Sequence, residues 1–280
     1  MVAPGVLLGV GSAAAWGTGD FAGGLAARRA GGMLVTGGAQ VVGFLLLLAA
    51  VFVLRPAPPA TATILLGAAG GVFGGIGLAA LYRGLSLGAM GLVSAVSGVG
   101  GVLIPLSVGF VLWGTVVHPM QLVGVALALA AVAAASGATT RGVHRDAVLL
   151  SIVAAAGFGL WFVFLDRAAA HDQQLWALVA ARASAALVIG GTALLRSRRA
   201  GLRSVLPLVG LAGAMDVTAN GMVVLSFATI PVGIAAALSG TYPLATMLLA
   251  RTLLGEALPR LGLLAVVLAV GGIVLISLGG

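Results

Sequence analysis

The stretch "AALSGTYPLATMLLARTLLGEALPRLGLLAVVLAVGGIVLIS", residues 236 to 277, contains two long apolar runs joined by a short connector. Its charged residues, Arg251, Glu256 and Arg260, lie in or beside that connector. A helix that crosses a lipid bilayer needs about 20 consecutive apolar residues. The stretch therefore predicts two membrane-spanning helices, over 232 to 251 and 258 to 278.

The rest of the chain has the same character. Of its 280 residues, 61% are hydrophobic and 7% are charged, and the mean hydropathy is +1.23, which excludes an ordinary soluble domain. The same length rule gives eight further spans: 5 to 26, 34 to 54, 62 to 82, 90 to 112, 119 to 138, 147 to 166, 174 to 195 and 204 to 227. We therefore expect an all-α integral membrane protein with ten transmembrane helices and no soluble domain. The start "MVAPGVLLGV" lacks a basic region, so we expect a retained first helix and not a cleaved signal.

Composition also excludes several kinds of site. The formal net charge is +8, but the charges are scattered between apolar runs, so they indicate loop charges and not a nucleic-acid-binding face. All 14 basic residues are arginines and there is no cysteine, which excludes a Schiff-base lysine, a Walker-type loop, disulfides and thiolate metal sites. The histidines, His118, His144 and His171, fall in connectors without metal-ligand spacing. We expect no metal, no cofactor and no intramembrane catalytic set, and hence no enzyme.

The two halves of the chain resemble each other. A shift of 141 residues lays "AAAWGTGDF" (13 to 21) over "AAAGFGLWF" (154 to 162), and a shift of 140 lays "LSLGAM" (85 to 90) over "LSFATI" (225 to 230). Five helices per copy is an odd number, so the second copy sits inverted in the membrane, as in many secondary transporters. We expect two inverted five-helix repeats, residues 1–140 and 141–280.

The closing stretch resembles the end of EamA-type members of the drug/metabolite transporter superfamily. In these, a proline in the ninth helix precedes a Gly-Glu pair and a glycine-rich tenth helix; the counterparts here are Pro243, Gly255 and Glu256. "AAAWGTGDF" is similar to the family's opening segment. The first repeat departs from the pattern, because "WGTVVHP" has Thr115 where the acid belongs. The resemblance implies a ten-helix fold with a central cavity and transport of a small metabolite, in a family that moves amino acids, nucleotide-related compounds, sugars and drugs.

Glycine is abundant, with 45 residues, and it clusters in "GAAGGVFGGIG", residues 67 to 77. A phosphate-cradling loop is one interpretation. Because lipid supplies no hydrophobic force between helices, close helix packing through small residues is the favoured one.

Polar residues inside the predicted spans point to a site. Away from the helix ends, the ionisable residues are Asp20, Arg182 and Asp216, and Asn220 lies one turn after Asp216. Charges at this depth are costly, so each should face the interior and find a partner. A purely structural Arg182 ion pair is one alternative. Because two acids share one base, the other interpretation leaves one carboxylate for a proton or a substrate cation, and counting along the helices assigns Asp216 to Arg182 and leaves Asp20.

Other residues have two interpretations each. Trp16 and Trp161 wall a cavity or simply pack. Tyr242 with Pro243 breaks the ninth helix and either contacts substrate or only shapes the helix. Glu256 caps the connector between the ninth and tenth helices or pairs with Arg251 or Arg260.

Arginine counts predict the orientation. The odd-numbered connectors carry Arg28, Arg29, Arg83, Arg141, Arg145, Arg196, Arg198, Arg199, Arg203, Arg251 and Arg260, whereas the even-numbered ones carry Arg55 and Arg167. The positive-inside rule then places the odd connectors in the cytoplasm and both termini outside.

We expect a plasma-membrane secondary-active transporter of a small organic solute that works by alternating access, with the proton as a candidate coupling ion. The alternatives are a scaffolding membrane protein and a lipid flippase of the same fold. The candidate site residues are Trp16, Asp20, Trp161, Arg182, Asp216, Asn220 and Tyr242.

Overall fold

The computed structural model describes residues 3–114, 118–138, 144–168, 173–196, 202–226 and 238–278. Within these ranges the protein is all helical and contains no strand. Counting α7, η3 and α8 as one rod, the described part of the chain forms ten helices. Thr115, His171, Arg141, Arg198 and Arg199, and the part of the predicted ninth helix before residue 238, lie outside the described residues.

The first-half helices are α1 (Ala3–Ala30), α2 (Gly32–Leu54), α3 (Thr61–Ser86), α4 (Met90–Trp113) and α5 (Pro119–Ala138). The second-half helices are α6 (Arg145–Ala168), α7 (Gln174–Ala185), η3 (Ala186–Gly190), α8 (Gly191–Arg196), α9 (Leu202–Ser226), α11 (Tyr242–Leu254) and α12 (Arg260–Leu278). The segment η3 is a π-helical turn that joins α7 to α8. Gly31 alone separates α1 from α2, with a φ of 81° that a residue with a side chain rarely adopts.

The all-α prediction is confirmed, and most predicted spans lie inside observed helices. Six of the described helices are long and apolar enough to cross a membrane: α2, α3, α4, α6, the rod from α7 to α8, and α9. Helix α1 has the length but is less apolar, because it is rich in glycine, contains Ser12, Thr18 and Asp20, and ends in Arg28 and Arg29. The apolar stretches of α5, α11 and α12 are shorter. The predicted break at Tyr242 is confirmed, because α11 begins there with Pro243 in its first turn, where proline costs no hydrogen bond.

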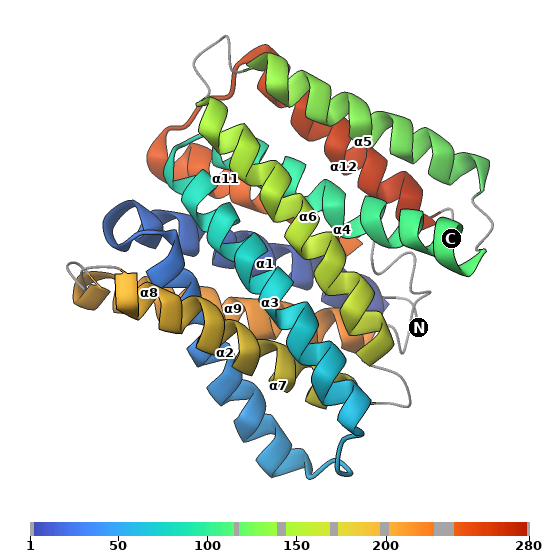
Figure 1. Cartoon of the computed structure of the whole chain (residues 1–280). Helices are drawn as coiled ribbons and strands as arrows, with labels where there is room; N and C mark the ends of the chain where they lie inside the picture. Colours follow the sequence, from blue (N-terminus) through green and yellow to red (C-terminus); the bar gives the residue numbers. More distant parts are fainter. Residues whose placement is uncertain are drawn as a thin grey trace.

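Helices from the two halves interleave. The most extensive packing joins α3 to α6, α1 to α9, and α5 to α12, followed by α4 with α6 and α3 with α7. Figure 1 shows α5 and α12 side by side along one edge of the bundle, while α1, α3, α4 and α6 occupy its middle.

The glycine cluster of α3 packs helices together, as the favoured interpretation predicted. Gly67, Gly71 and Gly75 face α7, since a Cβ added to them would meet Ala177, Ala181 and Ala185 respectively. Gly70, Gly74 and Gly77 face α6 in the same way. Two glycine rows therefore let α3 approach two neighbours at backbone distance.

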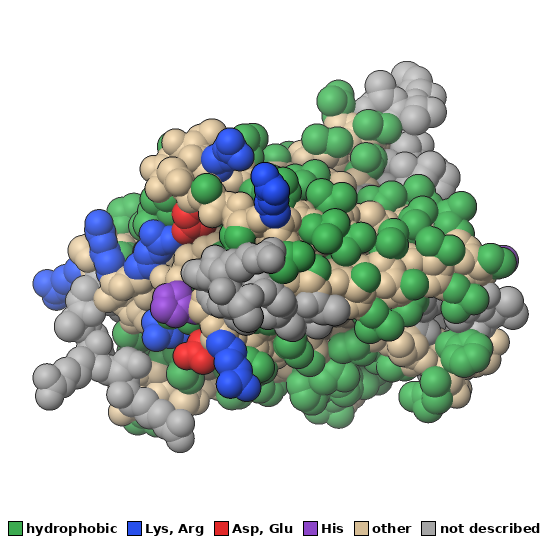
Figure 2. Space-filling model, turned by 90° about the horizontal axis from the view of Figure 1, so that it is seen from above, with side chains coloured by type: hydrophobic (Ala, Val, Ile, Leu, Met, Phe, Trp, Pro, Cys, Tyr) green, Lys and Arg blue, Asp and Glu red, His purple; other side chains and the backbone are tan. Residues whose placement is uncertain are grey.

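The outer surface is apolar and its charges lie at the ends. Large hydrophobic side chains such as Leu7, Phe52, Phe110, Leu195 and Leu248 are exposed, which suits a lipid environment. Figure 2 shows the arginine and acidic side chains of this view gathered at one end of the molecule. Arg28 and Arg29 lie at the end of α1, and Arg260 lies at the start of α12. The start of α1 and the end of α12 therefore lie together at the other end of the bundle (Figure 1).

Candidate functional site

A cavity of about 130 Å³ lies inside the bundle. Eight helices contribute to its wall, namely α1, α2, α3, α4, α6, α7, α9 and α11, whereas α5 and α12 do not. Glycines 71, 74 and 75 of α3 and 98 and 101 of α4 are part of its wall. The polar lining comes from α1, α2, α7, α9 and α11.

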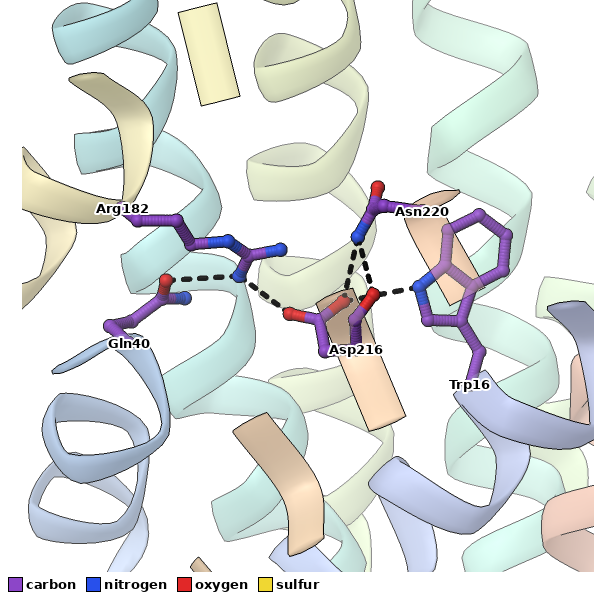
Figure 3. A network of polar contacts seen from close by, with 5 residues as sticks. All are labelled: Trp16, Gln40, Arg182, Asp216 and Asn220. Carbon is purple, nitrogen blue, oxygen red and sulfur yellow. Dashed lines mark hydrogen bonds and ion pairs between the residues drawn. The ribbon is translucent and has the colours of Figure 1, made fainter. Parts of the chain in front are cut away.

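Arg182 and Asp216 form an ion pair across this cavity. Arg182 Nη1 lies 2.5 Å from Asp216 Oδ2, and the two side chains are 9% and 22% exposed. The same nitrogen donates to Gln40 Oε1 at 2.9 Å. Figure 3 shows the resulting chain, which runs from α2 through α7 to α9. The pairing that helix counting predicted is confirmed.

Asp216 has further partners on its other oxygen. Trp16 Nε1 donates to Oδ1 at 3.1 Å, and Asn220 Nδ2 donates to the same atom at 3.2 Å. Asn220 also donates to the backbone oxygen of Asp216 at 2.6 Å, as expected for residues one turn apart. These bonds converge on Asp216 in Figure 3, so its charge is balanced by Arg182 and its oxygens are occupied.

Asp20 has a different environment. Its side chain lines the same cavity and the residue is 8% exposed, but among the described residues no basic side chain lies within ion-pair distance. Ser94 Oγ of α4 donates to Asp20 Oδ2 at 3.1 Å. The carboxyl group is therefore held in place by a neutral donor and faces the cavity without a counterion from the described chain.

Aromatic side chains form much of the remaining wall. Trp16 and Tyr242 meet edge to face, with ring centroids 6.1 Å apart and an interplanar angle of 69°. Trp161 and Phe162 of α6 form a second such pair at 4.7 Å and 68°, and Phe158 lies beside them in the lining. The cavity thus combines acidic groups with aromatic surfaces.

Six of the seven candidate residues line this one cavity, and Asn220 reaches it through Asp216. Sequence reasoning missed Gln40 and Ser94. Both are polar residues in predicted spans, and Gln40 could have been found by the rule that picked Asn220. Among the residues that the structure describes, no group of three or more histidine or acidic side chains is arranged to hold a metal ion.

The expectation for Glu256 was wrong. Its Oε1 pairs with Arg28 Nη2 at 2.7 Å, not with Arg251 or Arg260, and its Oε2 accepts the backbone N–H of Met90 at 3.0 Å. Met90 is the first residue of α4, where backbone N–H groups lack partners within the helix. Glu256 therefore joins the end of α1 and caps the start of α4.

Comparison with known families supports the sequence resemblance. Residues 146–278 match the EamA-like transporter family. The second half of the chain is an EamA domain. It spans α6 to α12 and contributes Trp161, Arg182, Asp216 and Tyr242 to the cavity. The EamA domain and the apolar helices make this chain a multi-pass membrane protein.

The fold of the whole chain also has a counterpart. A solved crystal structure matches it with a TM-score of 0.61 and 19% sequence identity, over 99% of this chain and 98% of the other. At this identity the likeness concerns the fold alone. Comparison with curated proteins gave no significant match.

Proposed function

We propose that this protein is a secondary-active transporter that carries a small organic metabolite through the cavity by alternating access. The observation that carries this proposal is a cavity that holds a buried ion pair and an uncompensated carboxyl group inside an apolar helical bundle. Intramembrane ionisable groups around a cavity mark solute or ion pathways. A scaffolding protein needs no such groups, because apolar packing between small residues holds helices together in lipid.

The proposal includes two inverted five-helix repeats, residues 1–140 and 141–280. Helix packing supports them. If α1 to α5 correspond in order to α6, the α7–α8 rod, α9, α11 and α12, the packing of α3 on α6 has its counterpart in α9 on α1. The pair α5 and α12 is its own counterpart, and these are the two helices outside the cavity wall. Movement of one repeat against the other then opens the cavity to each side in turn.

Orientation and coupling belong to the same proposal. The end of the bundle that carries Arg28, Arg29, Arg83, Arg251 and Arg260 faces the cytoplasm of a cell membrane, and both termini face outside. Asp20 is the group that exchanges a proton, because Asp216 is already balanced by Arg182.

Reconstituted vesicles test the proposal. We expect wild-type protein with an imposed pH gradient to accumulate at least one solute from a panel of small metabolites above protein-free vesicles. Asp20→Asn should fold normally and lose this accumulation. Asp166→Asn, an exposed acid at the end of α6 whose side chain is 72% exposed, is the matched control and should keep it. Wild-type uptake equal to that of empty vesicles across the panel would contradict transport.

A further inference from the structure

We infer that the solute of this cavity is a small organic cation, an amine with an apolar or aromatic body, whose ammonium group binds Asp20. The inference rests on the proposed function, because it assigns a substrate class to the same cavity.

The charges of the lining favour a cation. Among the residues that the structure describes, the charged side chains around the cavity are Asp20, Asp216 and Arg182. Arg182 and Asp216 cancel each other in their ion pair. With Asp20 ionised, the lining therefore has a net charge of −1, and a solute with one positive charge makes it neutral.

Asp20 has an oxygen available for a ligand. Oδ2 accepts from Ser94, and no described residue donates to Oδ1. Hydrogen bonds between an ammonium group and a carboxylate are shorter and stronger than neutral ones, and a dry site strengthens them further. The bond from Ser94 restrains the Asp20 side chain, which helps to position the carboxylate for a solute.

The aromatic residues suit the rest of such a solute. Trp16 lies one turn before Asp20 on α1 and packs against Tyr242, so two aromatic rings line the same cavity as the carboxylate. Aromatic faces attract cations, and Trp does so most strongly. Phe158, Trp161 and Phe162 add an apolar surface from α6 for a hydrocarbon or ring.

The cavity is small. Its volume of about 130 Å³ is well above the roughly 10 to 15 Å³ that a single water needs, so it admits a small solute. An anion of this size would add to the negative charge. A carboxylate on the solute would also have to compete with Asp216 for Arg182.

A ligand series with a common phenyl ring tests the inference on the wild-type protein. Phenethylamine, 2-phenylethanol, 3-phenylpropionate and phenylalanine share a phenyl ring and differ in charge. We expect calorimetry on purified protein to show phenethylamine binding at least tenfold more tightly than the other three. Tighter binding of the anion, the zwitterion or the neutral alcohol would overturn the inference without any variant.

Two variants then locate the binding group. Asp20→Asn should reduce phenethylamine affinity at least tenfold and leave 2-phenylethanol unchanged, whereas Asp166→Asn should change neither. A preference for the amine that survives Asp20→Asn would overturn the assignment to Asp20.

Uptake of the same series separates this inference from the proposed function. Transport of an anion or a neutral solute alone would contradict the cationic substrate but support the transport function. Tight amine binding with no uptake of any solute would support the cation site but contradict the transport function.

Discussion

Arg182 is nearly buried and depends on Asp216 and Gln40 for its polar contacts. Removing one partner of a buried ion pair leaves the other charge uncompensated and costs about 3 to 5 kcal/mol. We therefore expect Arg182→Ala to lower the melting temperature by several degrees and to reduce the yield of monodisperse protein on size-exclusion chromatography. Asp20→Asn should have little effect in the same assays, since Asp20 has no ion-pair partner among the described residues. Equal, small losses for both variants would contradict a stabilising buried pair.

Sequence reasoning reached the charged residues of the site but not their neutral neighbours. A charge inside a membrane must find a partner, so Arg182 and Asp216 could be assigned to each other from their depth alone. Ser94 carries no such demand, because a serine in a helix can bond the carbonyl of its own preceding turn. Gln40 is a stronger signal, but its partner lies 142 residues away and nothing in the local pattern names it.

Helices α3 and α7 pack so closely that their backbones are in contact. In a Gly71→Ala variant the new methyl group would collide with the backbone oxygen of Ala181 and with Ser184, so the helices must separate. We expect this variant to lower the melting temperature and the folded yield. Gly210→Ala in α9 is the control, since nothing lies within 4 Å of the added methyl group. Alanine is the better helix former by about 1 kcal/mol, so the control should be neutral or slightly more stable. A Gly71→Ala protein as stable as Gly210→Ala would show that this close approach is dispensable.

A second prediction at this scale concerns Glu256, which joins α1 to α4. Glu256→Gln removes the ion pair with Arg28 and the negative charge at the start of α4. Since the pair is partly exposed, we expect a loss of about 1 kcal/mol in the free energy of unfolding. High salt should lower the stability of the wild type more than that of the variant, because salt screens exposed charges. An identical salt response would argue against the electrostatic role.

The sequence pointed to Arg251 and Arg260 as partners of Glu256 because they are near in the chain, whereas the fold brings Arg28 from 228 residues away.

At the scale of the whole molecule, the orientation can be tested with single cysteines in this cysteine-free chain. Ala257 lies exposed in the connector between α11 and α12, and Ala57 lies exposed in the connector between α2 and α3. If the arginine-rich end is cytoplasmic, Ala57→Cys should react with an impermeant thiol reagent in intact cells and Ala257→Cys should react only after permeabilisation. The opposite labelling would reverse the proposed orientation.

The helical architecture was predictable because each span must satisfy its own backbone hydrogen bonds in lipid, which leaves long apolar runs in the sequence. Which helices become neighbours was not predictable from hydropathy. The packing of α1 on α9 and of α3 on α6 depends on the fit of small residues such as Gly19 and Gly157, and many such residues are scattered along the chain. Helix α1 shows the limit of the hydropathy rule, since the residues that make it central to the cavity also make it less apolar.

Among the residues that the structure describes, Asp20 is the one carboxyl group of the cavity without a counterion, and in the proposed transporter this sets how transport responds to voltage. One carboxylate accepts one proton or one monovalent cation, and either leaves the cavity neutral, whereas the empty cavity carries a charge that is costly to move through the membrane interior. We therefore expect the bundle to reorient only when loaded, so that proton and cation exchange one for one and no net current flows. Each uncompensated charge would couple to the membrane potential by about 2.3 kcal/mol per 100 mV. Uptake into vesicles should thus follow the pH gradient and ignore a potassium diffusion potential; a rate that changes with that potential would require a different stoichiometry.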